Sequence, residues 1–181
     1  MTIVGQNAAM RYLTIVRHAK AAPVQSGAND FDRPLSAKGR AQCEQLRVWA
    51  SDPNSLGAYG PTTALASSSA RTRETYAVAF AGTPFVHALE VSSLIYNGAR
   101  HVSAQDLLSE LAAIDPGHES LLVVAHNPSV LELVRTLCVE EIPALAKDKF
   151  PTSTAVVLRL VENETVGLRS YSFETSFLPE I

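Results

Sequence analysis

Short apolar runs alternate with segments of helical length along most of this chain, and this alternation limits the possible folds more than any other feature. The runs with the β-branched, apolar character of buried strands are residues 13–16, 62–66, 83–89 and 121–125. The segments expected to be helices begin after Ser36 and cover residues 69–80, 104–114 and 130–137. Strand alternating with helix predicts an α/β protein with three α/β/α layers and a mainly parallel central sheet.

The C-terminal part of the chain follows a different pattern. Residues 155–161 and 165–173 both have the character of strands, and only Glu162-Asn163-Glu164 separates them. A connection this short joins antiparallel strands, because a parallel pair needs a crossover of a dozen residues or more. We therefore expect an antiparallel edge near the C-terminus.

Composition indicates a folded domain of ordinary size. With 181 residues, 46% of them hydrophobic and 18% charged, the chain is long enough for one domain, expected over residues 11–181. Residues 1–10 lack the basic start and apolar centre of a signal peptide, and are expected to be a disordered extension in which Met10 is an alternative start. Cys43 and Cys138 are expected to be buried free thiols, so a cytoplasmic location is predicted.

Charge and motif content exclude several classes of function. A formal net charge of −3 gives no global field that draws the chain to nucleic acid or to an anionic membrane. No apolar run approaches the ~18 residues of a membrane span. No HExxH motif, histidine pair or cysteine cluster indicates a metal, and no cofactor is expected. The oligomeric state is left open. Any anionic ligand must then be held by a local cluster of arginine and histidine.

Such a cluster is predicted where three strands end. Arg17 and His18 follow the first strand, Arg71 begins the helix after the second, and His126 follows residues 121–125. The carboxyl ends of parallel strands open on one edge of the sheet, where α/β proteins bind ligands. Two arginines and two histidines therefore converge with the amide groups of helix N-termini, a set that suits phosphoryl transfer.

Each of these residues also has a structural interpretation. His18 is an alternative strand cap, and His126 is an alternative core histidine because it follows the most strand-like run. Arg73 competes with Arg71, but it is expected on another helix face, as a solvated partner of Glu74. Asp32 and Arg33 alternatively form an ordinary exposed ion pair worth ~0–1 kcal/mol.

Five segments, in order, give the chain a family resemblance. They are VRHAKA at 16–21, DRPLSAKGRAQ at 32–42, SSSARTRET at 67–75, VVAHNP at 123–128 and FPTSTAVVL at 150–158. With them the chain resembles the histidine phosphatase superfamily, whose fold is that of phosphoglycerate mutase. RHAK in place of RHGE, together with DRPLS, is most similar to the small bacterial phosphohistidine phosphatases of the SixA type.

The resemblance implies a role for each matching residue. His18 would be the nucleophile that takes the phosphoryl group, Arg17 and Arg71 would clamp its oxygens, and His126 would donate to them from the other side. Arg33 would order the loop of the site, and the binding set is completed by Asn127 and Lys20. The implied enzyme is a phosphatase that needs no metal.

The chain departs from the larger superfamily at the general acid. Mutases and many phosphomonoesterases carry a glutamate after the third strand, whereas Glu90 is the only carboxylate in LEVSSLIYNGAR and is placed early. An alkoxide leaving group needs a proton, but a protonated phosphoimidazole leaves as neutral imidazole. The expected substrate is therefore phosphohistidine on a protein partner. The alternatives are a small phosphoester, with Glu90 as a weak candidate acid, and a phosphate-binding module without turnover.

The mouth of the site is expected to carry positive charge. The loops at 22–33 and 139–151 border it, and neither is long enough for a deep lid. Four basic residues are expected at its rim: Lys20, Arg33, Lys147 and Lys149. An open, basic crevice suits a histidine that projects from an acidic protein partner.

Overall fold

A mixed six-stranded sheet forms the centre of the molecule. The structure is a computed structural model, and it describes residues 12–61, 63–114, 120–163 and 168–180. The strands are β1 (Tyr12–Arg17), β2 (Thr63–Ser67), β3 (Ala88–Ser92), β4 (Ser120–Ala125), β5 (Ala155–Asn163) and β6 (Leu168–Phe177). Their order across the sheet is β3-β2-β4-β1-β5-β6. The first four are parallel, and β5 runs antiparallel to both β1 and β6. The predicted sheet is confirmed.

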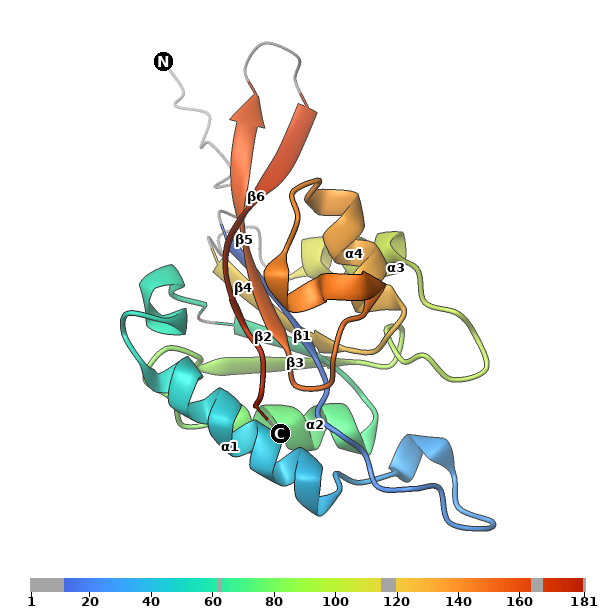
Figure 1. The fold of residues 1–181 in the computed structure, drawn as a ribbon. Helices are drawn as coiled ribbons and strands as arrows, with labels where there is room; N and C mark the ends of the chain where they lie inside the picture. The colour runs from blue at the N-terminus through green and yellow to red at the C-terminus, as the bar shows by residue number, and fades with distance from the viewer. Residues whose placement is uncertain (1–11, 62, 115–119, 164–167, 181) are drawn as a thin grey trace, which may run out of the picture.

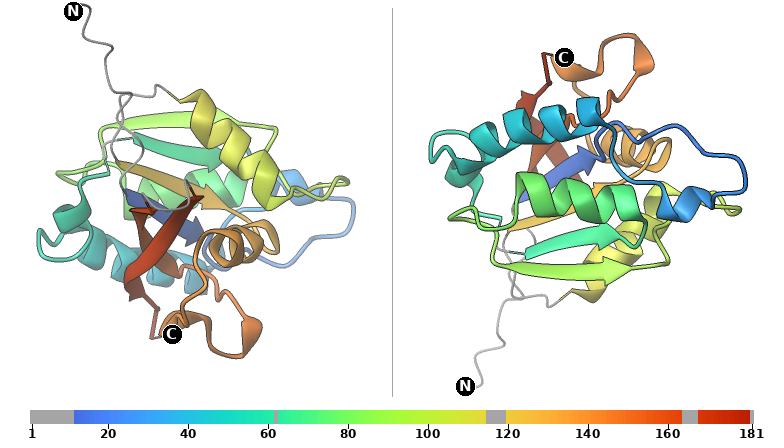
Figure 2. Two further views of the ribbon diagram at one scale, coloured as in Figure 1. Left: turned by 90° about the horizontal axis from the view of Figure 1, so that it is seen from above. Right: turned by 90° about the horizontal axis from the view of Figure 1, so that it is seen from below.

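Two pairs of helices cover the two faces of the sheet (Figures 1 and 2). The helices are α1 (Ala37–Ser51), α2 (Ala70–Ala79), α3 (Ala104–Ala113) and α4 (Ser129–Leu137). Helix α1 packs beside α2 on one face, and α3 packs beside α4 on the other. The 3-10 helices among the described residues are η1 (Asp30–Asp32), η2 (Leu56–Tyr59) and η3 (Pro143–Asp148). The α/β/α layering is confirmed. None of the described helices is long and apolar enough to cross a membrane.

Alternating side chains of the central strands build two separate cores. On β1, Leu13 and Ile15 join the core under α3 and α4, whereas Val16 joins the core under α1 and α2. A strand buried on both faces has no solvated side for a charge, so charged groups gather at its end. The two free cysteines, Cys43 and Cys138, are buried, and burial raises the pKa of both thiols.

The start of α1 is locked to the segment that follows β1. Ser36 is the N-cap of α1, where its hydroxyl accepts the amide of Gly39 at 3.0 Å, and its own amide and hydroxyl both donate to the Lys20 carbonyl. A Cβ at Gly39 would lie 2.1 Å from that carbonyl oxygen, so only glycine allows this approach. The helix therefore fixes the backbone two residues after His18.

Two strand predictions need correction. The third strand is Ala88–Ser92, not 83–89, because Pro84 has no amide hydrogen to donate and Val86 is buried in the core from a non-strand segment. The C-terminal hairpin is longer than predicted: β5 includes Glu162 and Asn163, and β6 begins at Leu168. Its turn at 164–167, the end of the third helical segment at 115–117 and the predicted extension at 1–10 lie outside the described residues.

Candidate active site

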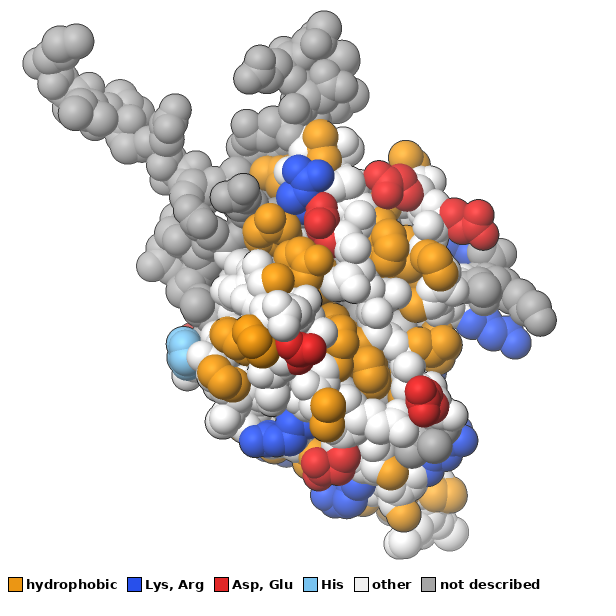
Figure 3. All heavy atoms as spheres, turned by 60° about the vertical axis from the view of Figure 1, so that its left-hand side comes forward, with side chains coloured by type: hydrophobic (Ala, Val, Ile, Leu, Met, Phe, Trp, Pro, Cys, Tyr) orange, Lys and Arg blue, Asp and Glu red, His pale blue; other side chains and the backbone are white. Residues whose placement is uncertain are grey.

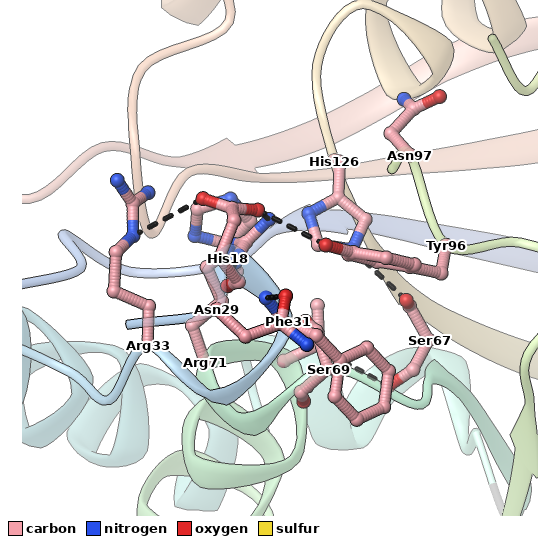
Figure 4. A network of polar contacts seen from close by, with 12 residues as sticks. His18, Asn29, Phe31, Arg33, Ser67, Ser69, Arg71, Tyr96, Asn97 and His126 are labelled. Carbon is pink, nitrogen blue, oxygen red and sulfur yellow. Dashed lines mark hydrogen bonds and ion pairs between the residues drawn. The ribbon is translucent and has the colours of Figure 1, made fainter. Parts of the chain in front are cut away.

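The carboxyl ends of β1, β2 and β4 bring the four candidate residues together (Figure 4). Arg17 is the last residue of β1 and pairs in register with Ala125, the last residue of β4. His18 and His126 therefore follow adjacent strands, and their ring centroids lie 4.9 Å apart. Arg71 lies in the first turn of α2, just beyond β2, and its charge lowers the pKa of both histidines.

His18 is held as a neutral imidazole with one defined lone pair. Its Nδ1 lies 2.8 Å from the carbonyl oxygen of Ala19, which only accepts, so Nδ1 carries the proton and Nε2 the lone pair. Burial lowers the pKa of His18 to about 3, and the charges of Arg71, Arg17 and Arg33 act in the same direction. At neutral pH the ring is an unprotonated nucleophile.

His126 is also buried and neutral. Its Nε2 lies 2.9 Å from the hydroxyl of Ser67, the last residue of β2. Burial lowers the pKa of His126 to about 2, with further lowering from His18 and Arg71. Tyr96 packs edge-on against this ring with centroids 5.7 Å apart. The ring is therefore fixed between β2 and Tyr96, next to His18.

The two arginines each keep a buried donor without an acceptor. Arg17 donates through Nη1 to the Phe150 carbonyl at 2.6 Å, and Arg71 donates through Nη1 and Nη2 to the backbone carbonyl and carboxylate of Asp30, at 2.7 and 3.0 Å. Within the described part of the chain, the Nε atoms of both arginines are buried and unpaired. An unpaired buried donor is costly, so these N–H groups indicate a site for an anion.

Comparison with solved structures shows which family has this fold. A structure from Agrobacterium tumefaciens assigned as phosphohistidine phosphatase SixA has a TM-score of 0.71 and 26% identity, over 93% of this chain and 98% of that one. A SixA assignment from Nakamurella multipartitia has a TM-score of 0.69 and 21% identity, over 94% and 97%. The chain belongs to the histidine phosphatase superfamily. No protein-family model and no curated protein sequence matches it.

Two further neighbours of this histidine phosphatase were solved with oxyanions. A protein histidine phosphatase SixA complexed with tungstate has a TM-score of 0.68 and 23% identity, over 92% of this chain and 96% of that one. A mycobacterial glucosyl-3-phosphoglycerate phosphatase in complex with VO3 has a TM-score of 0.58 and 15% identity, over 91% and 98%. At these identities the likeness is one of fold.

The remaining predicted residues of the phosphatase occupy different positions. Arg33 reaches the cluster, since its charge lowers the pKa of His18 and its Nε lies 3.4 Å from an oxygen of Asp30. Asn127 donates to the Phe150 carbonyl at 3.2 Å, the same oxygen that Arg17 contacts. The Lys20 side chain is exposed, and its backbone amide and carbonyl order the loop instead.

Glu90 does not join the cluster. It is exposed near the middle of β3, opposite Leu65, and it lines a groove of about 510 Å³ together with Ser92, Glu110 and Ile114. None of the four candidate catalytic residues lines that groove. The residues that the structure describes contain no group of three His, Cys, Asp or Glu able to hold a metal ion.

Two pairings expected from the sequence are wrong. Arg73 is exposed as predicted, but Glu74 pairs with Arg40 at 2.9 Å instead. Arg33 pairs with Asp30, one 3-10 turn away, and not with the adjacent Asp32. Neighbours in sequence on a helix point in different directions, and in both cases the tighter geometry comes from a residue further along the chain.

Two functional candidates were missed by the sequence interpretation, Asp30 and Tyr96. Asp30 contacts Arg71, which is 41 residues away, and Tyr96, which is 66 residues away and donates to its Oδ2 at 3.1 Å. The three-residue spacing of Asp30 and Arg33 within a loop of the site was the available signal for Asp30. No pattern near Tyr96 indicated its place beside His126.

Proposed function

We propose that this phosphatase hydrolyses phosphohistidine on a protein partner through a phosphorylated intermediate on His18, without a metal. The observation that carries the proposal is the state of His18. Its Nε2 bears the lone pair, because Nδ1 donates to Ala19, and two buried guanidinium groups with unpaired Nε atoms accompany it. A nucleophile and donors for phosphate oxygens are what phosphoryl transfer needs.

In the first step the Nε2 lone pair of His18 forms a bond to phosphorus while the phosphorus–nitrogen bond of the substrate breaks. Arg17 and Arg71 hold the phosphoryl oxygens through N–H groups, and His126 donates a hydrogen bond to them. The Nδ1 proton stays on His18, where the Ala19 carbonyl stabilises the positive charge that the ring acquires. The substrate imidazole leaves with the electron pair of the broken bond.

In the second step water attacks phosphorus and the bond to Nε2 breaks. His18 regains its lone pair and leaves as the neutral ring, still protonated on Nδ1, so the nucleophile is ready for another cycle. The two protons of the water remain on the product, H2PO4−. The positive charge on the phosphorylated ring makes it a good leaving group, and no acid is needed at this step.

The substrate follows from the missing acid. Glu90 faces a separate groove, and Asp30 has a lowered pKa, so neither is suited to protonate an alkoxide. A phosphoimidazole that is already protonated needs no such donor. The 26% identical neighbour, assigned as a phosphohistidine phosphatase, supports the same class. The neighbour that acts on glucosyl-3-phosphoglycerate keeps a small phosphoester as the second candidate.

Phosphate trapping tests this function. Brief incubation with a 32P-labelled phosphohistidine protein, followed by quenching in base, is expected to leave acid-labile label on His18. EDTA is expected to leave turnover unchanged, and His18→Ala is expected to abolish both label and turnover. Equal or faster turnover of small phosphoesters would favour the second candidate. A chain with neither label nor phosphate release would be a binding module.

A further inference from the structure

Asp30 is the acidic side chain that contacts the candidate phosphate clamp. Its Oδ2 accepts from Nη2 of Arg71 at 3.0 Å and from the hydroxyl of Tyr96 at 3.1 Å. Its Oδ1 lies 3.4 Å from Nε of Arg33, an ion-pair distance without a hydrogen bond, and that Nε is itself unpaired. A carboxylate has about four lone-pair positions. Oδ1 therefore has room for a further donor.

The contacts form a closed circuit around one volume (Figure 4). His18 faces His126, His126 faces Tyr96, Tyr96 donates to Asp30, and Asp30 holds Arg71, whose charge acts back on His18. The floor of this circuit is buried, since His18 is 8% exposed, whereas the Asp30 side chain is 45% exposed. Asp30 therefore lies on the side of the circuit that faces solvent.

In-line transfer places the leaving group on that outer side. The attacking and leaving atoms lie on opposite sides of phosphorus, so a group displaced by the buried His18 departs toward solvent. It then passes Asp30 and the edge-to-face pair of Phe31 and Tyr96, whose centroids are 5.0 Å apart. A carboxylate beside two aromatic rings suits a flat, cationic heterocycle, which stacks on the rings and donates to the carboxylate.

We infer that Asp30 determines specificity at this site: its carboxylate accepts the N–H of a protonated imidazole leaving group and so selects phosphorus–nitrogen over phosphorus–oxygen substrates. This inference rests on the proposed function. The substrate enters with a proton on the ring nitrogen that is not phosphorylated. As the phosphorus–nitrogen bond breaks, its electron pair goes to the leaving nitrogen, and a neutral imidazole departs with that proton still directed at Asp30.

The charge state of Asp30 supports this role and argues against that of a general acid. Partial burial raises the pKa of the carboxyl, but the charge of Arg71 and hydrogen bonds from Tyr96 and Arg71 outweigh burial and hold the pKa below its usual value. The group is therefore an acceptor at neutral pH. It has no proton for an alkoxide, whereas a protonated imidazole brings one.

The test compares two small substrates that differ in their leaving group. Phosphoimidazole leaves as a ring with an N–H, and p-nitrophenyl phosphate leaves as a stable phenolate with no N–H. For Asp30→Asn and Asp30→Ala we expect the ratio of kcat/KM for phosphoimidazole to kcat/KM for p-nitrophenyl phosphate to fall by about 10-fold or more, the size of a hydrogen bond to a charged group. Asp32→Asn, an exposed carboxylate on the same 3-10 helix, is the matched control and is expected to keep the ratio.

The outcomes separate this inference from the proposed function. If both substrates slow by the same factor in both Asp30 variants, Asp30 only holds Arg71 in place and the inference is overturned, while the function stands. If the wild-type enzyme shows no phosphoimidazole turnover and no label on His18, the proposed function itself fails. Thermal melting of each variant confirms that the comparison is made on folded protein, and p-nitrophenyl phosphate turnover gives a second measure of an intact site.

Discussion

At the scale of single residues, the site is built from neutral histidines next to permanent cations. His18 and His126 sit in a buried cluster where ionisation is disfavoured, and both pKa values lie far below the ordinary value of 6.5. The arrangement keeps the nucleophile unprotonated without a general base. It also means that the folded state resists protonation more strongly than the unfolded chain does.

The lowered histidine pKa values predict a loss of stability in acid. The unfolded chain binds protons at these histidines below pH 6.5, whereas the folded state does not bind them until the pH approaches 3 for His18 and 2 for His126. The free energy of unfolding is therefore full above pH 6.5 and falls below it, by up to about 1.4 kcal/mol per pH unit per histidine. Urea denaturation at pH 7 and pH 5 should show a smaller difference for His126→Asn than for the wild type. Equal differences would contradict the lowered pKa of His126.

The unpaired guanidinium donors predict a large loss of rate from a conservative change. Lysine at position 71 keeps the charge but loses Nε and the planar fork that matches phosphate oxygens. Arg71→Lys is expected to lower kcat/KM by ~10²–10³, by analogy with other donors to a developing charge. Arg73→Lys, exposed on the same helix, is the matched control and should retain the wild-type rate. A small effect at Arg71 would remove it from the phosphate clamp.

At the scale of elements, the most exacting contact is the one between α1 and the backbone after β1. The Lys20 carbonyl accepts two bonds from Ser36 and touches Gly39 where any side chain would collide. Gly39→Ala is expected to lower the free energy of unfolding by about 1–3 kcal/mol through overpacking. Lys38→Ala, an exposed neighbour in the same turn, should have little effect. Urea denaturation measures both, and equal stabilities would show that the helix shifts freely.

The sequence predicted the elements that have strong local signals. The core strands β1 and β4 are nearly pure apolar runs, and α1 begins at the N-cap expected from Ser36. The edge strand β3 was misplaced because its own residues are mostly exposed and the preceding apolar segment is buried without being a strand. Local pattern measures burial, and at an edge burial and strand pairing separate.

The site was predictable to the extent that strand ends collect side chains. His18, Arg17, Arg71 and His126 follow from a parallel sheet, in which the ends of β1, β2 and β4 share one edge. Asp30 and Tyr96 do not follow, because they come from loops whose path only the folded chain defines. Contacts over 41 and 66 residues leave no periodic trace in a single sequence.

At the scale of the whole molecule, charge is mixed and the net charge is −3. On the face in Figure 3, basic and acidic side chains lie interspersed among hydrophobic ones. The site differs, since Arg17, Arg33 and Arg71 all act on His18, and the exposed Lys20 and Lys149 flank it in the chain. The side chain of Lys147, also predicted at the rim, lies outside the described residues. A local cationic field therefore exists within a weakly acidic protein.

This local field predicts that turnover of a protein substrate is sensitive to salt. Attraction between a basic mouth and an acidic partner speeds encounter by 10-fold or more, and it is screened once the Debye length falls to a few ångströms at about 1 M salt. With a phosphohistidine protein, kcat/KM is expected to fall about 10-fold between 0.02 and 0.5 M NaCl, and the Lys20→Gln, Lys149→Gln double variant should show a shallower fall. Arg159→Gln is the control, since Arg159 pairs with Tyr12 at the opposite end of β1 and is equally a surface cation. Because phosphoimidazole carries little charge to steer, its turnover should change less over the same range. An equal salt dependence for the two substrates would mean that salt acts on the buried arginines and not on encounter with a partner.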